Sequence, residues 1–129
     1  MTSLLASYQK QAYALLRIVA GFLFIFHGTQ KLFDFPIPTG GELGPLLLWV
    51  AAPVELFGGA LIAIGLFTRW AAFVCSGQMA VAYWAFHASR GLTPLENHGE
   101  LAVLYCFVFL CIAASGPGIW SLDRAQGRA

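Results

Sequence analysis

Charged residues are scarce in this sequence: seven lysines and arginines and six aspartates and glutamates among 129 residues give a net charge of +1. A soluble domain carries about 25% charged residues, so this chain has too few charges to cover a surface that faces water. Lipid is therefore the expected solvent. The sequence also lacks the basic stripe with which nucleic-acid-binding proteins displace counterions from phosphates, which excludes that class.

Cysteines are also few, and no Cys-x-x-Cys motif occurs. On a single helix, Cys106 and Cys111 would point about 140° apart at about 100° per residue. This argues against a thioredoxin-type site, and we interpret Cys75, Cys106 and Cys111 as small packing residues. No serine-nucleophile motif, phosphate-binding loop or nucleotide-binding fingerprint occurs either.

Long apolar runs dominate what is present. A membrane-spanning helix needs roughly 20 residues, range about 17 to 25, and four runs approach that length: residues 12–33, 46–67, 70–87 and 98–115. Thr68-Arg69 leaves room only for a tight turn, so the second and third spans should be antiparallel neighbours. We predict an all-α integral membrane protein, a single four-helix bundle that occupies residues 1–129.

The positive charges predict the orientation of this bundle. With an even number of spans, both termini lie on one side, and the positive-inside rule makes that side cytoplasmic. The cations on this side outnumber Lys31 and Arg90 opposite; they are Lys10, Arg17, Arg69, Arg124 and Arg128. Residues 1–11 hold one lysine and no Ala-x-Ala signal follows, so the first run should remain as a membrane anchor.

Three charged residues near the cytoplasmic side are interpreted as architecture. Arg17 lies about one and a half turns inside the first span, close enough for its side chain to snorkel to the interface. Asp123 follows Pro117 on the same side, and we expect it to pair with Arg69 or Arg17 and pin the tail beneath the bundle.

Glu55 is the sharpest signal for a site. It lies about 13 Å into the second span at about 1.5 Å per residue, where a charged group costs about 2.5–3.5 kcal/mol. Such a carboxylate must be paired, hydrogen-bonded or protonated, and the candidate partners are His27, Lys31 and Gln78. Two interpretations remain open: a helix–helix hydrogen bond that fixes register, or a proton-accepting or ligand-binding carboxylate.

Most other polar residues at membrane depth gather toward the outer half, which predicts a polar pocket open to the outer leaflet. With Glu55, these residues are His27, Gln30, Lys31, His87, Asn97, His98 and Glu100. Gln78 and His87 are nine residues apart, about 900° at 100° per residue, so a regular helix would point them to opposite faces.

The start of the fourth span has two interpretations. His98 shares a helical face with Ala102 and Tyr105, whereas Glu100 points about 200° away from His98. Both residues could serve the pocket, or both could simply begin a helix, where acidic groups suit the helix dipole. We expect no metal site, because no pair among the three histidines, Glu55 and Glu100 has the i, i+3 or i, i+4 spacing of helical ligands.

Several short stretches along the chain form a recognisable pattern. They are Leu16-Arg17, His27-Gly28-Thr29-Gln30-Lys31-Leu32, Glu55 with Gly58-Gly59, Gly65 with Thr68-Arg69, Asn97 with Gly99-Glu100, and Gly116-Pro117-Gly118 with Ser121-Leu122-Asp123. On these stretches the sequence resembles the DoxX family of small bacterial membrane proteins. It departs from the common Asn-Gly-Gly-Glu motif by placing His98 at the first glycine.

The resemblance implies a multi-pass protein of the bacterial inner membrane, often described as an oxidoreductase or an oxidoreductase subunit. The expected function is a redox-linked membrane subunit that binds a quinone and works with a soluble or membrane redox partner. In that hypothesis Glu55, His27 and His98 exchange protons, and the ligand contacts residues among Gln30, Lys31, Gln78, His87, Asn97, Glu100 and Tyr105. The alternatives are a non-catalytic scaffold for a soluble enzyme and a small-molecule or proton carrier, the latter as a homo-oligomer.

Overall fold

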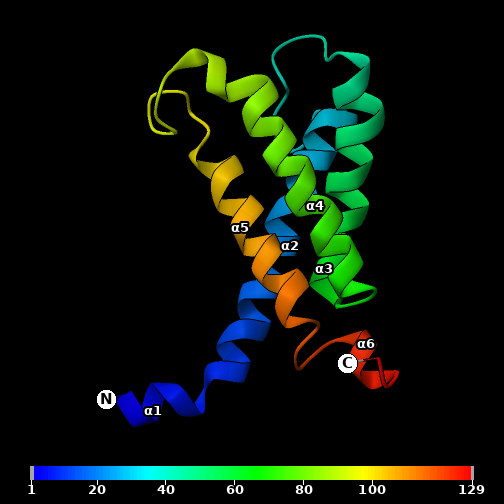
Figure 1. Ribbon diagram of the computed structural model, residues 1–129. Helices are drawn as coiled ribbons and strands as arrows, with labels where there is room; N and C mark the ends of the chain where they lie inside the picture. Colours follow the sequence, from blue (N-terminus) through cyan, green and yellow to red (C-terminus); the bar gives the residue numbers. More distant parts are fainter. Residues whose placement is uncertain (1, 129) are drawn as a thin grey trace.

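The computed structural model describes residues 2–128, and this part of the chain is helical with no strand (Figure 1). The first and last helices are the short α1 (Thr2–Ser7) and α6 (Leu122–Ala125). Between them lie α2 (Gln9–Phe33), α3 (Gly59–Ile64), α4 (Thr68–Ala82) and α5 (Glu100–Ser115). The other helical segments are the wider π-helices η1 (Leu47–Ala51), η2 (Val54–Gly58) and η3 (Tyr83–His87), and the 3₁₀ turn η4 (Ala88–Arg90).

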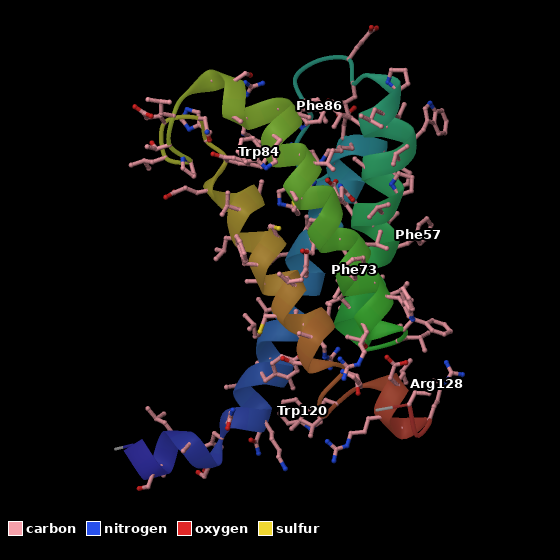
Figure 2. All side chains as sticks on the ribbon, in the orientation of Figure 1. Phe57, Phe73, Trp84, Phe86, Trp120 and Arg128 are labelled. Carbon is pink, nitrogen blue, oxygen red and sulfur yellow. The ribbon has the colours of Figure 1, made fainter. Side chains whose placement is uncertain are left out.

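Among residues 2–128, two helices are long and apolar enough to cross a membrane. They are α2 and the continuous helix Leu47–Ile64, which contains η1, η2 and α3. Many large apolar side chains point away from the packed interior, including Phe57 and Phe73 in Figure 2. The fold is thus all-helical with membrane-helix character, as the sequence predicts.

The backbones of α2 and the helix Leu47–Ile64 touch each other. A Cβ on Gly21 would lie 2.6 Å from the carbonyl oxygen of Gly59, and one on Gly28 would lie 2.6 Å from the nitrogen of Leu56. Small residues allow such close approach where lipid provides no hydrophobic drive between helices. These glycines make α2 and Leu47–Ile64 one closely packed pair.

Helices α4 and α5 form a second pair. The Ser76 hydroxyl of α4 donates to the Cys106 carbonyl of α5 at 2.7 Å. Stacked rings of α5 then meet α2, because Phe24 lies 5.1 Å from Tyr105 and 4.8 Å from Phe109, centroid to centroid. This aromatic contact joins the two helix pairs in the core.

The turn between α3 and α4 lies earlier than the sequence predicted. Gly65 ends α3 in the left-handed region at φ 72°, and Phe67 precedes α4 at φ 48°. The turn is therefore formed by residues 65–67, and Thr68 and Arg69 already belong to α4. The prediction was displaced because hydropathy alone does not reveal where the positive-φ residue stops a helix.

Arg17 is fully buried and does not snorkel. Its Nη1 donates to the carbonyl oxygens of Ile62 and Ala63 at 2.7 and 2.8 Å, and its Nη2 donates to that of Trp120 at 2.7 Å and that of Ile119 at 3.3 Å. These carbonyls lie at the end of α3 and in the C-terminal tail, where backbone donors are few, although Ile62 also accepts from the Gly65 N–H at 3.2 Å. Arg17 supplies the partners by remaining inside.

The tail is pinned under the helices, but not by the ion pair that the sequence suggested. Asp123 accepts hydrogen bonds from the backbone N–H groups of Phe67 and Thr68 and from the Thr68 hydroxyl, at 2.8–2.9 Å. Arg69 instead donates to the carbonyls of Ala113 and Ala114 at the end of α5. Within residues 2–128, neither Arg17 nor Arg69 forms an ion pair with Asp123, because backbone groups occupy all three side chains. We call Arg17, Thr68, Arg69 and Asp123 the tail layer.

Candidate functional site: a polar pocket between the helix pairs

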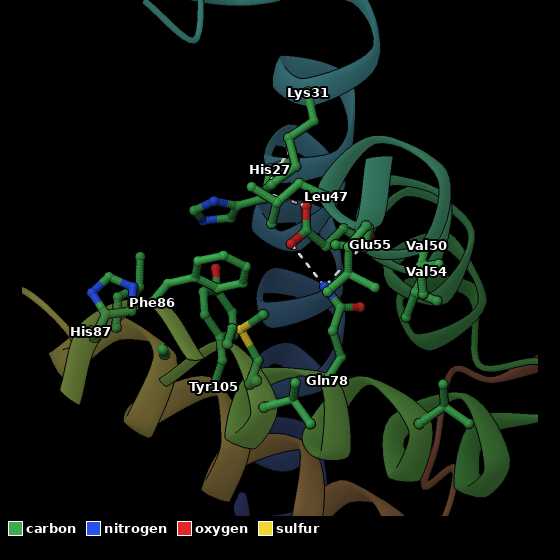
Figure 3. A pocket seen from close by; sticks show the side chains of 18 of the residues that line it. His27, Lys31, Leu47, Val50, Val54, Glu55, Gln78, Phe86, His87 and Tyr105 are labelled. Carbon is green, nitrogen blue, oxygen red and sulfur yellow. Dashed lines mark hydrogen bonds and ion pairs between the residues drawn. The ribbon is translucent and has the colours of Figure 1, made fainter. Parts of the chain in front are cut away.

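A cavity of about 640 Å³ lies between the two helix pairs, at the end away from the tail layer (Figure 3). Its walls come from α2, η1, η2, α4, η3 and α5. Most of the lining is apolar, and a few polar groups converge on the interior, an arrangement typical of a small-molecule site. Of the residues singled out in the sequence, those that line it are His27, Lys31, Glu55, Gln78, His87, His98 and Tyr105.

Three polar side chains from three helices meet at the base of this cavity. The Lys31 ammonium lies 2.7 Å from Glu55 Oε2, and Gln78 Nε2 donates to Glu55 Oε1 at 2.9 Å. Lys31 stands on the last turn of α2, Glu55 follows Pro53 in η2, and Gln78 projects from α4. The structure thus confirms two of the three predicted partners of Glu55. We call Lys31, Glu55 and Gln78 the polar triad.

His27 and Tyr105 face the cavity beside the polar triad. Their rings lie 5.8 Å apart in an edge-to-face arrangement. Neither the His27 ring nor the Tyr105 hydroxyl makes a hydrogen bond to any residue in the described part of the chain. His27 is therefore not a partner of Glu55, and both groups are available to a ligand.

Gln78 and His87 both line the cavity, although a regular helix would point them apart. The reason is the π-helix η3, in which the hydrogen bonds run from i to i+5. Each residue of such a wide turn rotates the chain by less than the usual angle, so His87 comes round toward the side of Gln78. The expectation of opposite faces was wrong because it assumed an α-helix throughout.

The mouth of the cavity carries His87, His98 and Arg90. His87 Nδ1 lies 3.1 Å from the Asn97 carbonyl, and His98 has φ 57° in the turn before α5. A glycine adopts this left-handed conformation freely, whereas histidine tolerates it, so the backbone explains why glycine suits this position in the Asn-Gly-Gly-Glu motif. Sequence reasoning missed Arg90, although it was one of two cations expected on the outer side.

Three predicted ligand-binding residues do not line the cavity. Asn97 is buried in the loop, where its amide donates to the Tyr83 hydroxyl and the Gly91 carbonyl and accepts from Gly99 N–H. Glu100 is exposed as the first residue of α5, and Gln30 lies on α2 outside the lining. Asn97 therefore shapes the loop that carries His98. Sequence reasoning also missed the apolar wall residues Phe86 and Met79, which carried no signal beyond their hydrophobicity.

Comparison with known proteins places this sequence in a family. A family model described as DoxX matches residues 12–88. The chain belongs to the DoxX family. It is 46% identical over 126 residues to a Haemophilus influenzae protein described as uncharacterized, covering 93% of this chain and 94% of that protein. A second uncharacterized Haemophilus influenzae protein is 29% identical over 89 residues, covering 69% of this chain and 59% of that protein. No solved structure matches.

The resemblance inferred from the sequence is thereby confirmed, and DoxX proteins are membrane proteins. The part of this DoxX chain that matches the family model runs from α2 to the end of η3 and contains the whole polar triad. The α5 wall, with His98 and Tyr105, lies beyond that match. The polar triad is therefore the part of the site that belongs to the matched family region.

Proposed function

We propose that this DoxX protein is a multi-pass membrane subunit of a quinone-coupled oxidoreductase system in the bacterial inner membrane. In this proposal α2, Leu47–Ile64, the α4–η3 helix and α5 all cross the bilayer, with both termini in the cytoplasm. Large exposed tryptophans support the placement: Trp49 and Trp84 lie at the pocket end and Trp70 and Trp120 at the tail end. Tryptophan favours both membrane interfaces.

The shape and chemistry of the cavity support a neutral, ring-shaped head group. Lys31 and Glu55 cancel each other's charge, so the base of the cavity offers hydrogen bonds without net charge. Tyr105, His27 and Phe86 provide ring surfaces around it. The polar triad around the buried Glu55, next to free His27 and Tyr105 groups, is the observation that carries the proposal.

Reduction of a quinone to a quinol consumes two electrons and two protons. The chain offers proton-exchanging groups at the cavity, namely Glu55, His27 and, at the mouth, His98. The electrons require a redox-active partner protein, soluble or membrane-bound, which this DoxX subunit would connect to the quinone pool. The chain itself binds and orients the head group and supplies its protons.

Direct titration of the purified protein with a short-tailed quinone analogue tests this proposal. We expect saturable binding to the wild type and at least about ten-fold weaker binding to Glu55→Gln, because a hydrogen bond to a charged group contributes about 1.5–3 kcal/mol. Glu42→Gln is the matched control, since Glu42 is an exposed carboxylate in the loop before η1. Absence of binding, or equal affinity in wild type and Glu55→Gln, would reject a quinone site here.

His27→Ala gives a second, independent measurement. The His27 ring makes no hydrogen bond in the described chain. Its removal should therefore spare the fold and lower only the affinity for the quinone analogue. Binding that is unchanged in His27→Ala but lost in Glu55→Gln would restrict the head-group contacts to the polar triad.

A further inference from the structure

A second hollow of about 420 Å³ lies beside the polar pocket, on the surface between Leu47–Ile64 and α4. The residues that line it come from η2, α3 and the first turns of α4. They include Phe57, Leu61, Phe67, Trp70 and Ala71. None of the described residues that line this hollow is charged, so its lining is matched to a hydrocarbon chain.

The two hollows adjoin each other, and we call them together the combined groove. Val54 and Val74 line both of them, one on each side of the crevice between the two helices. The polar triad lies near the middle of this combined groove, and the turn at residues 65–67 lies close to the end of the apolar hollow. From Glu55 to Leu61 the groove follows about 9 Å of helix, at about 1.5 Å per residue.

The polar pocket also opens sideways. Val50 and Val81, which line its walls, are 53% and 60% exposed on the outer surface of the helices. In a membrane protein this surface faces acyl chains, not water. A ligand can therefore reach the polar triad from the bilayer by passing between η1 and the last turn of α4.

We infer that the ligand of this site is an amphiphile with a flexible apolar chain, which enters laterally from the bilayer. Its head group lies at the polar triad, and its chain lies along the groove past Val54 and Val74 toward Leu61 and Trp70. This inference rests on the proposed function and defines its substrate class: a long-chain lipid-soluble quinone in place of a water-soluble one. Lipid competes for an apolar groove on equal terms, so the polar triad must determine which chain occupies it.

Photolabelling in lipid nanodiscs tests where the chain lies. The probe is a quinone analogue with a long isoprenoid tail that carries a photoreactive group near its end, and the adducts are mapped by peptide mass spectrometry. We expect labelling of the groove walls, within residues 57–61 and 67–71, and loss of this labelling in Glu55→Gln. A tailless analogue added in excess should suppress the same adducts.

Leu61→Trp should block the groove and abolish labelling of its walls while the tailless analogue still binds. Ile64→Trp is the matched control, because Ile64 lies on α3 but lines neither hollow. The wild-type map decides the inference even if Leu61→Trp does not fold. Glu55-dependent binding of the tailless analogue without groove labelling would overturn the inference and leave the proposed function standing. Groove labelling that persists in Glu55→Gln would overturn the link between head and chain, and failure of every analogue to bind would reject the proposed function itself.

Discussion

The two ends of the molecule bury charge in opposite ways. In the tail layer, the buried Arg17 and Asp123 and the exposed Arg69 bind backbone carbonyls or N–H groups at helix ends. In the polar triad, Lys31 and Glu55 bind each other and border a cavity that also exposes unbonded groups. Buried charge alone therefore does not identify a site; a site also needs space and groups that the fold leaves available.

Arg17→Ala should give the largest loss of stability and so test the structural half of this comparison. It removes the guanidinium donor from four carbonyls, of which Ile62 alone keeps a backbone donor, and we expect a loss of about 3–5 kcal/mol in the free energy of unfolding. Arg17→Lys should recover only part of this stability, because one ammonium cannot bridge two pairs of carbonyls. Thermal unfolding in a single detergent measures both, with the exposed Arg124→Ala as control; a small effect of Arg17→Ala would mean that water replaces the guanidinium.

Removing Lys31 or Glu55 from their ion pair should lower the free energy of unfolding by unequal amounts. The Lys31 side chain retains 18% exposure and the Glu55 side chain 4%, so an unpaired lysine can reach the interface but an unpaired carboxylate cannot. We expect Lys31→Met to cost about 2–4 kcal/mol and Glu55→Gln less, with much of the loss recovered in the double variant. Unfolding midpoints of the four proteins test this, and equal single losses that simply add would contradict the pairing.

Asp123 should make the tail layer sensitive to acid. Burial acts to raise the pKa of Asp123, but hydrogen bonds from the Thr68 N–H and hydroxyl and from the Phe67 N–H, with the charge of Arg128, hold it below its usual value. Because the folded pKa is depressed, the stabilisation is present above the unfolded pKa of about 3.9 and is lost as the pH falls through the folded pKa.

Asp123→Asn should accordingly lower stability by about 1–2 kcal/mol at pH 7, as expected for a charged group at a helix start. The difference from the wild type should shrink as the pH falls below about 4. Unfolding midpoints from pH 3 to 7 measure this difference, and a gap between the two proteins that stays constant over this range would assign the effect to packing alone.

His98→Gly should have the smallest effect on stability. A left-handed conformation costs a non-glycine residue about 1–2 kcal/mol, whereas glycine adds unfolded-chain entropy of about 0.5–1 kcal/mol. We expect the unfolding midpoint to stay the same or rise slightly, while His98→Ala falls below it. A clear loss in His98→Gly would show that the imidazole makes a stabilising contact at the mouth.

The sequence was sufficient for features that depend on local pattern or on the cost of burial. The apolar runs predicted the helices to within a few residues, and Lys31 and Gln78 were two of the three candidate partners expected for Glu55 from its depth, the third being His27. The sequence was insufficient where long-range geometry decides. Asp123 was correctly expected to pin the tail, but a helix start at Thr68 offers it better donors than an arginine does.

The cavity itself depends on backbone features with no sequence signature. The π-helix at residues 83–87 brings His87 to the side of Gln78, and no periodicity of 3.6 residues reveals such a turn. Asn97 was expected to bind a ligand because a polar residue at that depth must have hydrogen-bond partners. The structure supplies these partners within the loop that Asn97 supports. Residues such as Phe86 enter the site only because two helix pairs leave a space between them.

The glycine contacts on α2 have a mechanical consequence for that space. Gly21 and Gly28 join α2 to Leu47–Ile64 backbone to backbone, so these two helices have little room to move apart. Gly58, beside Gly59 on the same helix, leaves no room for a side chain against Cys75, so α4 also approaches closely there. On the cavity side of these contacts, the helix pairs diverge (Figure 1). We therefore expect the width of the cavity to change through movement of α4, η3 and α5, with α2 and Leu47–Ile64 held together.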